Sequence, residues 1–331
     1  MRDPRSSIKR SVRRTATAVR RGALWVDDRA LRVETYRRDG SVAEGDLAIA
    51  HLPPSRFLRF AFNAVLRRDP DPGAEASYLP RLESGEITPQ DVLDELRAAP
   101  ELRFTVPIRD LMLSLHHSRC DFVRTFPRAR RIVDLGGTDQ ADQWGALVAS
   151  LHYPYPFEEL TIVDLPLDDR HDLYRHSDQV DGVETPWGRI RYRYHSMTDL
   201  SGFADGETDL VYSGQTIEHV TAEDADIVLK EVHRILRPGG TLALDTPNRT
   251  VCRLQQASLI NPDHQLEYSA AELVDKIERA GLEVTELKGL NYLGHPASEG
   301  GFDREVVARN TGMYGQAEDC YLLAVTARRP G

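Results

Sequence analysis

The sequence predicts an α/β fold in which a small all-helical module precedes a doubly wound, mostly parallel sheet of seven strands. Short apolar runs alternate with helical segments from residue 131 to the end of the chain, a pattern typical of parallel strands joined by crossover helices. The first two runs end in an acidic residue. Because a doubly wound sheet binds ligands at the carboxyl ends of its strands, we expect a ligand site there.

The bulk composition bounds the classes of protein that this chain can belong to. Its 331 residues give room for one large domain and a small one. With 40% hydrophobic and 28% charged residues and no long apolar run, we expect a globular protein without a membrane span. The net charge of −10 argues against nucleic acid as a partner. Three scattered cysteines fit neither a disulfide framework nor a zinc site, and they favour a cytoplasmic location: Cys120, Cys252 and Cys320.

Residues 1–50 form a basic tail and an irregular segment. The stretch from Arg2 to Arg21 is strongly basic and lacks the apolar core of a signal peptide, while residues 31–36 have the composition of a strand. We interpret the basic stretch as a solvated tail. Contact with an anionic membrane or with a partner protein is left open, and so is a homo-oligomer.

Residues 51–104 are predicted to form the small helical module. Two prolines at 53 and 54 interrupt whatever precedes them, and helices are expected over 56–68, near 75–82, and from the N-cap Thr88 to Ala98. The first helix carries an apolar face at helical spacing: Phe57, Phe60 or Ala61, Ala64 and Val65. This segment resembles a module of unknown function found in bacterial proteins linked to glycans and glycosyltransferases, which implies a binding or docking unit.

Residues 105–331 are predicted to form the main domain. A helix over 101–124 should cover its edge, and strands are expected near 131–135, 160–165, 190–195, 209–213, 241–245, 282–288 and 320–328. One helix has clear end signals, with Ser269 as N-cap, Glu272 completing a capping box, and Gly281 at its end. We expect residues 289–315, which are rich in glycine, to be irregular and to cover the substrate.

The stretch 131–139 is the centre of the predicted ligand site. A β-branched pair is followed by Asp134 and by two adjacent glycines, Gly136 and Gly137. Glycine allows a positive φ and a close approach of the backbone to a ligand. The second run ends in Asp164, at a position suited to hold ribose hydroxyls.

Two later segments establish a resemblance to a known family. Residues 209–220 form a third run, and residues 236–248 read Leu-Arg-Pro-Gly-Gly before a strand and Thr-Pro-Asn after it. Over residues 130–329 the chain resembles the class I S-adenosylmethionine-dependent methyltransferases, which implies a Rossmann-like sheet. The first loop departs from the family pattern, because Thr138 and Asp139 stand where further glycine is usual.

The resemblance implies a set of residues that bind S-adenosylmethionine. The glycine turn would lie under the methionine part, the acid of the second run would hold the ribose, and the segment after the third strand would contact adenine, with Asp199 as a weaker candidate there. The cofactor residues are then Asp134, Gly136, Gly137, Asp164, Ser196, Met197 and Ser213.

A second group of residues predicts half of a metal site. Gln215, Glu218 and His219 are spaced to share one helical face, and His264 precedes the well-capped helix. The layout resembles the divalent-metal O-methyltransferases of ubiquinone biosynthesis and of small-RNA 2′-O-methylation, except that Gln215 replaces a glutamate. That implies magnesium or manganese, with Glu218, His219 and His264 as catalytic residues. Many family members carry Glu-His here without a metal, so the metal-free reading stays open.

The function predicted first is a metal-assisted S-adenosylmethionine-dependent O-methyltransferase that acts on a sugar hydroxyl of a glycan or glycolipid. The sugar rests on the helical module alone. Methylation of a phenolic or quinone precursor is the alternative, and a degenerate methyltransferase fold that serves as a scaffold is the non-enzyme alternative. Three further histidines are weaker candidates for a general base: His171, His176 and His295.

Overall fold

The computed structural model describes residues 52–139, 143–166 and 182–331. The predicted basic tail, the strand at 31–36, His171 and His176 lie outside these residues. The chain divides into two compact units, one ending at Val106 and the other comprising Pro107–Gly331, two residues from the predicted boundary. No described helix has the length and apolar character needed to cross a membrane.

The first unit contains four helices in its described part: α3 (Pro54–Leu66), α4 (Pro72–Glu83), α5 (Pro89–Ala98) and α6 (Glu101–Phe104). α4 begins earlier than predicted, because Asp71 caps it by accepting from the amide of Ala74 at 2.8 Å and Pro72 fits the first turn. Thr88 caps α5 as predicted, in a capping box with Asp91.

The apolar face of α3 differs in part from the prediction. Phe57 and Ala61 are buried as expected, whereas Ala64 and Val65 are only half-buried. Leu58, Phe62 and Leu66 are buried in their place, so the helix presents a face that is rotated relative to the prediction. These side chains pack with α5 and α6 around a core of their own.

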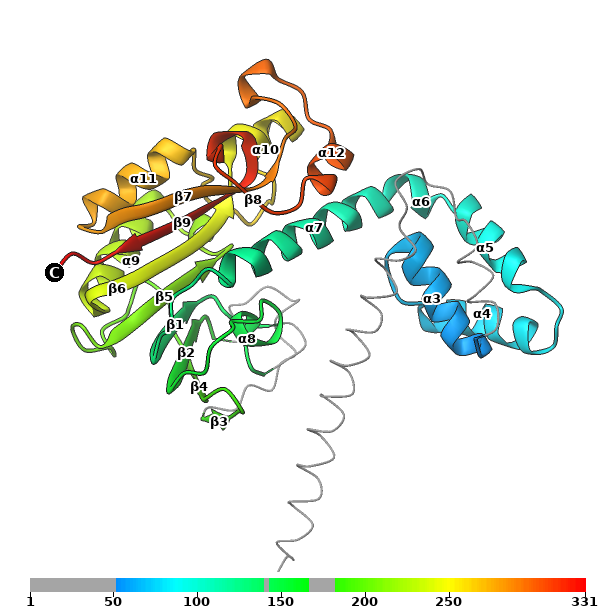
Figure 1. Ribbon diagram of the computed structural model, residues 1–331, viewed down its shortest axis with the longest axis horizontal. Coiled ribbons are helices and arrows are strands. Elements are labelled where there is room, and N and C mark those ends of the chain that lie inside the picture. The colour runs from blue at the N-terminus through cyan, green and yellow to red at the C-terminus, as the bar shows by residue number, and fades with distance from the viewer. Residues whose placement is uncertain (1–51, 140–142, 167–181) are drawn as a thin grey trace, which may run out of the picture. The chain divides into compact units, whose positions relative to one another are not determined.

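The second unit is built on one mixed sheet (Figure 1). Its central strands β4 (Arg189–Tyr194), β2 (Glu159–Asp164), β1 (Arg131–Leu135), β5 (Thr208–Gly214) and β6 (Leu236–Pro247) run parallel in that order. β9 (Cys320–Arg328) then lies antiparallel between β6 and β7 (Glu283–Tyr292). These seven strands form the Rossmann-like methyltransferase fold that the sequence predicts.

Two short strands extend the sheet beyond the seven predicted ones. β3 (Val183–Glu184) pairs with β4 and β8 (Met313–Tyr314) pairs with β7, both antiparallel. They bring the sheet to nine strands over the described residues. Two-residue strands leave no period in a sequence, so pattern reasoning does not detect them.

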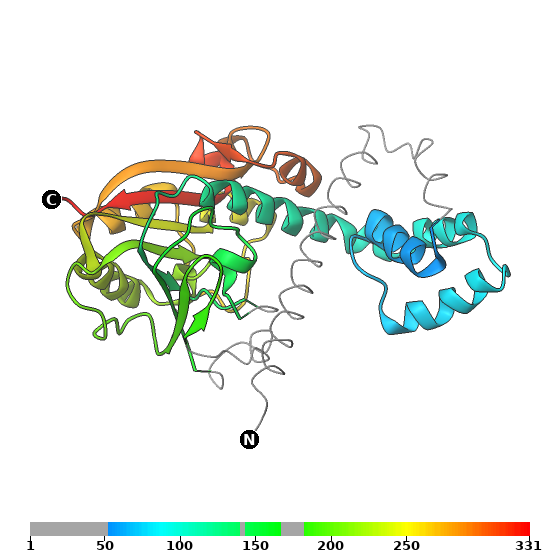
Figure 2. The same cartoon turned by 60° about the horizontal axis from the view of Figure 1, so that its bottom comes forward.

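Helices cover both faces of the sheet (Figures 1 and 2). α9 (Ala222–Ile235) and α11 (Ala270–Arg279) pack on one face. α7 (Val106–Val123), α8 (Ala146–Ala149), α10 (Arg249–Gln255) and α12 (Arg304–Arg309) pack on the other. The capping box of Ser269 and Glu272 on α11 is confirmed, and Gly281, with a φ of 89°, follows the end of that helix.

Two predicted segments are corrected by the structure. The helix expected over 101–124 breaks at Thr105, because Pro107 lacks an amide proton and is tolerated only in the first turn of the second piece. The segment 289–315 is more regular than predicted. It contains the end of β7, the 3₁₀ turn η4 (Ala297–Glu299), α12 and β8, and Asp303 caps α12 by accepting from the amides of Glu305 and Val306.

Candidate active site

The glycine turn after β1 has no room for larger side chains. Gly136 has a φ of 70°, and a Cβ on it would lie 2.5 Å from Cγ2 of Thr216. A Cβ on Gly137 would overlap the carboxylate of Asp134. The amide of Gly136 donates to the carbonyl oxygen of Val163 at 2.7 Å, which ties the turn to β2. Glycine is therefore required at both positions by the local backbone and packing.

The carboxyl group of Asp134 is buried beneath this turn, with 1% of the residue exposed. Burial raises its pKa well above the usual range, and the positive charge of Arg119 opposes that rise. Its Oδ2 has no hydrogen-bond partner among the described residues. A buried carboxylate oxygen without a partner is costly, so this atom is available to a polar ligand.

Two further buried hydroxyls near the turn also have no partner within the described chain. Thr138 follows Gly137 directly, and Ser213 pairs in register with Leu135 across β1 and β5. The Oγ1 of Thr138 and the Oγ of Ser213 are both unsatisfied. Together with Asp134, they give the turn a set of polar atoms without hydrogen-bond partners. A zwitterionic cofactor such as S-adenosylmethionine can form hydrogen bonds with these atoms, so the residues present fit that cofactor.

Asp164 stands at the carboxyl end of β2, half-buried. Its Oδ2 accepts from the amide of Thr138 at 3.3 Å, and its Oδ1 accepts from the amide of Leu165 at 2.8 Å. The first bond joins the acid to the glycine turn. The carboxylate is thus held beside the turn at the position predicted for a ribose-binding acid.

The segment after β4 holds the residues predicted to contact adenine. The Oγ of Ser196 accepts from the amide of Thr198 at 3.2 Å, and the side chain of Met197 packs into the core under α9. Asp199 is exposed and accepts from the amide of Ser201 at 3.1 Å, so its carboxylate stabilises its own turn. This local role fits the weaker status that the sequence assigns to Asp199.

The loop after β5 differs from the helix that the sequence predicts there. Gln215 has a left-handed φ of 58°, and only the 3₁₀ turn η3 (Ile217–His219) follows it. The predicted helical face for Gln215, Glu218 and His219 is therefore wrong. The Nε2 of Gln215 donates to Oδ1 of Asp245 at 2.8 Å, and its backbone amide donates to the Asp245 carbonyl oxygen at 2.8 Å; Asp245 thus stabilises the left-handed conformation.

Asp245 belongs to a buried polar network that sequence reasoning missed. Its Oδ1 also accepts from Nε of Arg119 at 2.7 Å, and its Oδ2 accepts from the hydroxyl of Tyr212 at 2.6 Å. Arg119 in addition donates to that hydroxyl at 3.1 Å. The network connects α7 with the ends of β5 and β6. An acid at the end of a predicted strand was the one signal in the sequence that pointed to Asp245.

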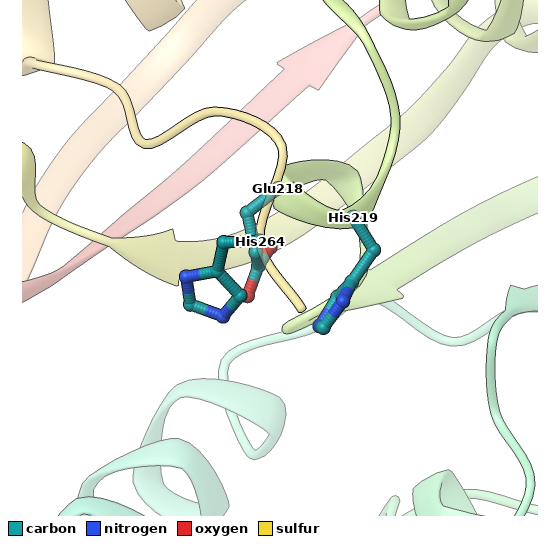
Figure 3. A group of neighbouring side chains, drawn as sticks. All are labelled: Glu218, His219 and His264. Atoms are coloured by element: carbon teal, nitrogen blue, oxygen red, sulfur yellow. The ribbon is translucent and has the colours of Figure 1, made fainter. Parts of the chain in front are cut away.

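Glu218, His219 and His264 come together although 45 residues separate the last two in the chain. Their ligand-capable atoms all lie within 4.8 Å of one another. Figure 3 shows the carboxylate and the two imidazole rings gathered between η3 and the loop that carries His264. The two rings meet edge to face, with centroids 4.9 Å apart. The structure thus brings together three of the four residues predicted to bind a metal.

Glu218 is fully buried, and its two oxygens differ. Oε2 accepts from Oγ1 of Thr246 at 2.9 Å, whereas Oε1 has no hydrogen-bond partner in the described part of the chain. Burial raises the pKa of Glu218 to about 8. A buried, unsatisfied carboxylate oxygen beside two imidazoles is the arrangement that a cation would stabilise.

Both histidines are oriented through Nδ1. That atom of His219 donates to the carbonyl oxygen of Asp263 at 3.2 Å, and that of His264 donates to Oε1 of Glu267 at 3.0 Å. Nε2 is then left as the lone-pair nitrogen of each ring. Histidines that bind metals commonly have this arrangement, so the residues present fit a divalent metal with mixed oxygen and nitrogen ligands.

Gln215 and His295 are not part of the group formed by Glu218, His219 and His264. The amide nitrogen of Gln215 is bound to Asp245, so its oxygen is the atom left for a ligand. His295, a candidate base, is half-buried, and its Nδ1 lies 3.0 Å from the carbonyl oxygen of Pro296. The carboxylate of Glu267 was also missed, although its position three residues after His264 was a readable signal.

Part of the chain is similar to known methyltransferases. Residues 147–244 match a family model described as a methyltransferase domain. A probable S-adenosylmethionine-dependent methyltransferase of Mycolicibacterium smegmatis is 34% identical over 108 residues, which are 33% of this chain and 41% of the relative. A ubiquinone biosynthesis O-methyltransferase of Xanthomonas euvesicatoria is 29% identical over 31% of this chain and 47% of its own length. The matches thus span less than half the length of these curated relatives.

Among solved structures, a putative methyltransferase of Haloferax volcanii in complex with the Trm112 methyltransferase activator is similar to this chain. The TM-score is 0.47 with 19% identity, covering 67% of this chain and 94% of that one. The described sheet has the strand order of a Rossmann-like methyltransferase fold, and residues 147–244 within it match the methyltransferase domain model.

Proposed function

We propose that this protein is an O-methyltransferase that transfers the methyl group of S-adenosylmethionine to a sugar hydroxyl of a glycan or glycolipid with the help of a divalent metal. The observation that carries the proposal is the group formed by Glu218, His219 and His264. Glu218 and His219 lie on the loop directly after β5, the strand that pairs with β1, and the loop before α11 adds His264. A cofactor-binding turn and a proton-handling group thus occupy the same edge of the sheet.

The chemistry of methyl transfer explains why both parts are needed. Transfer from a sulfonium is an in-line displacement, so the acceptor oxygen must be aligned with the methyl group. A hydroxyl is a poor nucleophile while it is protonated. When bound, a divalent metal would lower the pKa of a hydroxyl that it contacts and would orient it.

The roles of the residues follow from which of their atoms could accept a ligand. Oε1 of Glu218 and Nε2 of His219 and His264 would hold the metal, and the side-chain oxygen of Gln215 is a candidate fourth ligand. Asp134, Gly136 and Gly137 would support the methionine part of the cofactor. Asp164 would hold the ribose, with Ser196, Met197 and Ser213 as the remaining predicted contacts.

The proposal of a sugar acceptor rests on the helical module predicted over residues 51–104, which resembles modules of glycan-related bacterial proteins. We assign that module a docking role for the acceptor or for an assembly partner. The basic segment 2–21 would add contact with an anionic membrane or partner, and a cytoplasmic location suits a protein whose three cysteines are all free and buried.

A phenolic or quinone acceptor is the second candidate. The similarity to ubiquinone biosynthesis O-methyltransferases favours it. Neighbouring oxygens of a catechol would chelate a metal as well as a sugar diol does. The two candidates therefore share the site and differ only in the acceptor.

The test is transfer of a labelled methyl group to a panel of bacterial mono- and oligosaccharides and catechols, with added magnesium or manganese and again with EDTA. Transfer to a sugar that stops with EDTA is the expected result. Transfer to catechols alone would mean that the acceptor is a phenol and not a sugar. Transfer that continues in the presence of EDTA would exclude a metal from the reaction. No transfer together with no binding of S-adenosylmethionine would favour a scaffold role.

A further inference from the structure

Glu267 is a fully buried acid with no place in the predicted site. It lies just before α11, on the same loop as His264, and 0% of it is exposed. Its Oε1 accepts from Nδ1 of His264 at 3.0 Å and from the amide of Ile260 at 2.6 Å. Its Oε2 lies 3.4 Å from Nη1 of Arg253. A carboxylate buried this deeply is costly, which calls for a role.

The bond to His264 has a chemical consequence. Oε1 also accepts from the Ile260 amide, and a carboxylate oxygen can only accept, so Nδ1 of His264 carries the proton in that bond. The neutral ring then exists as the Nδ1–H tautomer. Its Nε2 then carries the lone pair, and His264 lies in the group whose ligand atoms are within 4.8 Å of those of Glu218 and His219.

The same loop also holds the backbone of Glu218. The carbonyl oxygen of Glu218 accepts from the amides of Gln265 and Leu266, at 2.8 and 3.2 Å. Glu267 accepts hydrogen bonds from Ile260 and His264, which fixes the loop of residues 260–267 beside η3. The orientation of the imidazole therefore depends on the Glu267 side chain, which also links the two ends of a loop that backbone hydrogen bonds hold against Glu218.

We propose that Glu267 is a positioning residue that sets the tautomer of His264 and directs its Nε2 into the group formed with Glu218 and His219. The proposal deepens the proposed function and rests on it for the use of that nitrogen. It holds whether Nε2 binds a metal or takes a proton from the acceptor, because either use needs the lone pair on Nε2.

The tautomer can be read directly from the ring nitrogens. The full chain is labelled with ¹⁵N-histidine, and His264 is assigned by the signal that disappears in His264→Asn. We expect the Nδ1–H form in the unchanged protein. Finding the Nε2–H form there would overturn the proposal without the need for any variant at Glu267.

Variants then separate positioning from general stability. Glu267→Leu removes the acceptor and should shift His264 to the Nε2–H form. Glu267→Gln keeps an oxygen acceptor without the charge and should retain the tautomer. Glu272→Gln is the matched control, because Glu272 is a carboxylate in the exposed capping box of α11. An unchanged His264 tautomer in a folded Glu267→Leu protein would contradict the proposal.

The affinity of the cofactor-free protein for Mn²⁺ provides a second measurement. We expect Glu267→Leu, which removes the acceptor, to weaken it by about 10- to 100-fold, the usual effect of losing such a partner, and to leave the affinity for S-adenosylmethionine unchanged. Equal Mn²⁺ affinity in both proteins would count against Glu267. If the unchanged protein binds no Mn²⁺, the metal part of the proposed function fails while the tautomer measurement still decides the role of Glu267.

Discussion

Oγ1 of Thr216 donates a hydrogen bond of 3.0 Å to the carbonyl oxygen of Leu135, between the loop after β5 and the end of β1. This bond joins the two halves of the candidate site, because Leu135 precedes the glycine turn and Thr216 precedes Glu218 by two residues. The methyl group of Thr216 also occupies the space beside Gly136. Changes at the glycine turn should therefore affect the group around Glu218.

Gly136→Ala tests this packing. The left-handed φ should cost about 1–2 kcal/mol, and the overlap with Thr216 should add about 1–3 kcal/mol. Gly206→Ala is the matched control, because Gly206 has a φ of 69° and a Cβ there would meet its nearest atom at an ordinary 3.7 Å. Thermal unfolding of both variants measures the difference in stability. An equal loss of stability in both would show that the Thr216 side chain moves aside without an energetic cost.

Asp134→Asn tests the buried acid through the pH dependence of stability. The pKa of Asp134 is raised in the folded chain, so the folded state keeps this proton to higher pH than the unfolded state, whose carboxyl has a pKa of about 3.9. The stability contributed by Asp134 should then fall as the pH rises from the unfolded-state pKa towards the higher pKa of the folded state.

The melting temperature of Asp134→Asn relative to the unchanged protein should therefore rise as the pH increases above about 4. Calorimetry over that range without cofactor checks it. Affinity for S-adenosylmethionine should fall in the same variant, since the carboxylate is assigned to the cofactor. A constant difference in melting temperature would mean that Asp134 titrates normally.

Asp164→Ala tests the ribose assignment. Loss of a charged acceptor should cost about 1.5–3 kcal/mol of cofactor binding, which is about 10- to 100-fold in Kd. Isothermal titration with S-adenosylmethionine measures it. Asp205→Ala serves as control, because Asp205 is an exposed acid paired with Arg234. Unchanged affinity in Asp164→Ala would move the ribose site elsewhere.

Glu218→Ala and His264→Ala test the metal group. Each should lower turnover about 100-fold or more, the amount that handling of one proton contributes, while cofactor affinity stays the same. EDTA should have the same effect on the unchanged enzyme. Asp263→Asn keeps the backbone carbonyl that orients His219 and changes only an exposed carboxylate, so it should remain active. Full activity in both alanine variants would exclude the group from the mechanism.

Much of the fold could be read from the sequence because its signals are local. The strands β1, β2 and β5 follow apolar runs bounded by turns, and the capping boxes of α5 and α11 need only residues three apart. Asp134, the two glycines and Asp164 were placed at strand ends because parallel strands present their carboxyl ends on one edge. These features depend on neighbours in the chain.

The features that only the tertiary structure decided depend on distant residues. The left-handed Gln215 is held by Asp245, and the loop is therefore a 3₁₀ turn rather than the helix that spacing predicts. The pairing of His264 with Glu218 and the burial of Glu267 arise because the loop before α11 folds against η3. The sequence by itself determined which residue types are present and which strand ends carry them. Hydrogen bonds between remote segments decided which atoms of these residues face one another, because such bonds leave no periodic pattern in the sequence.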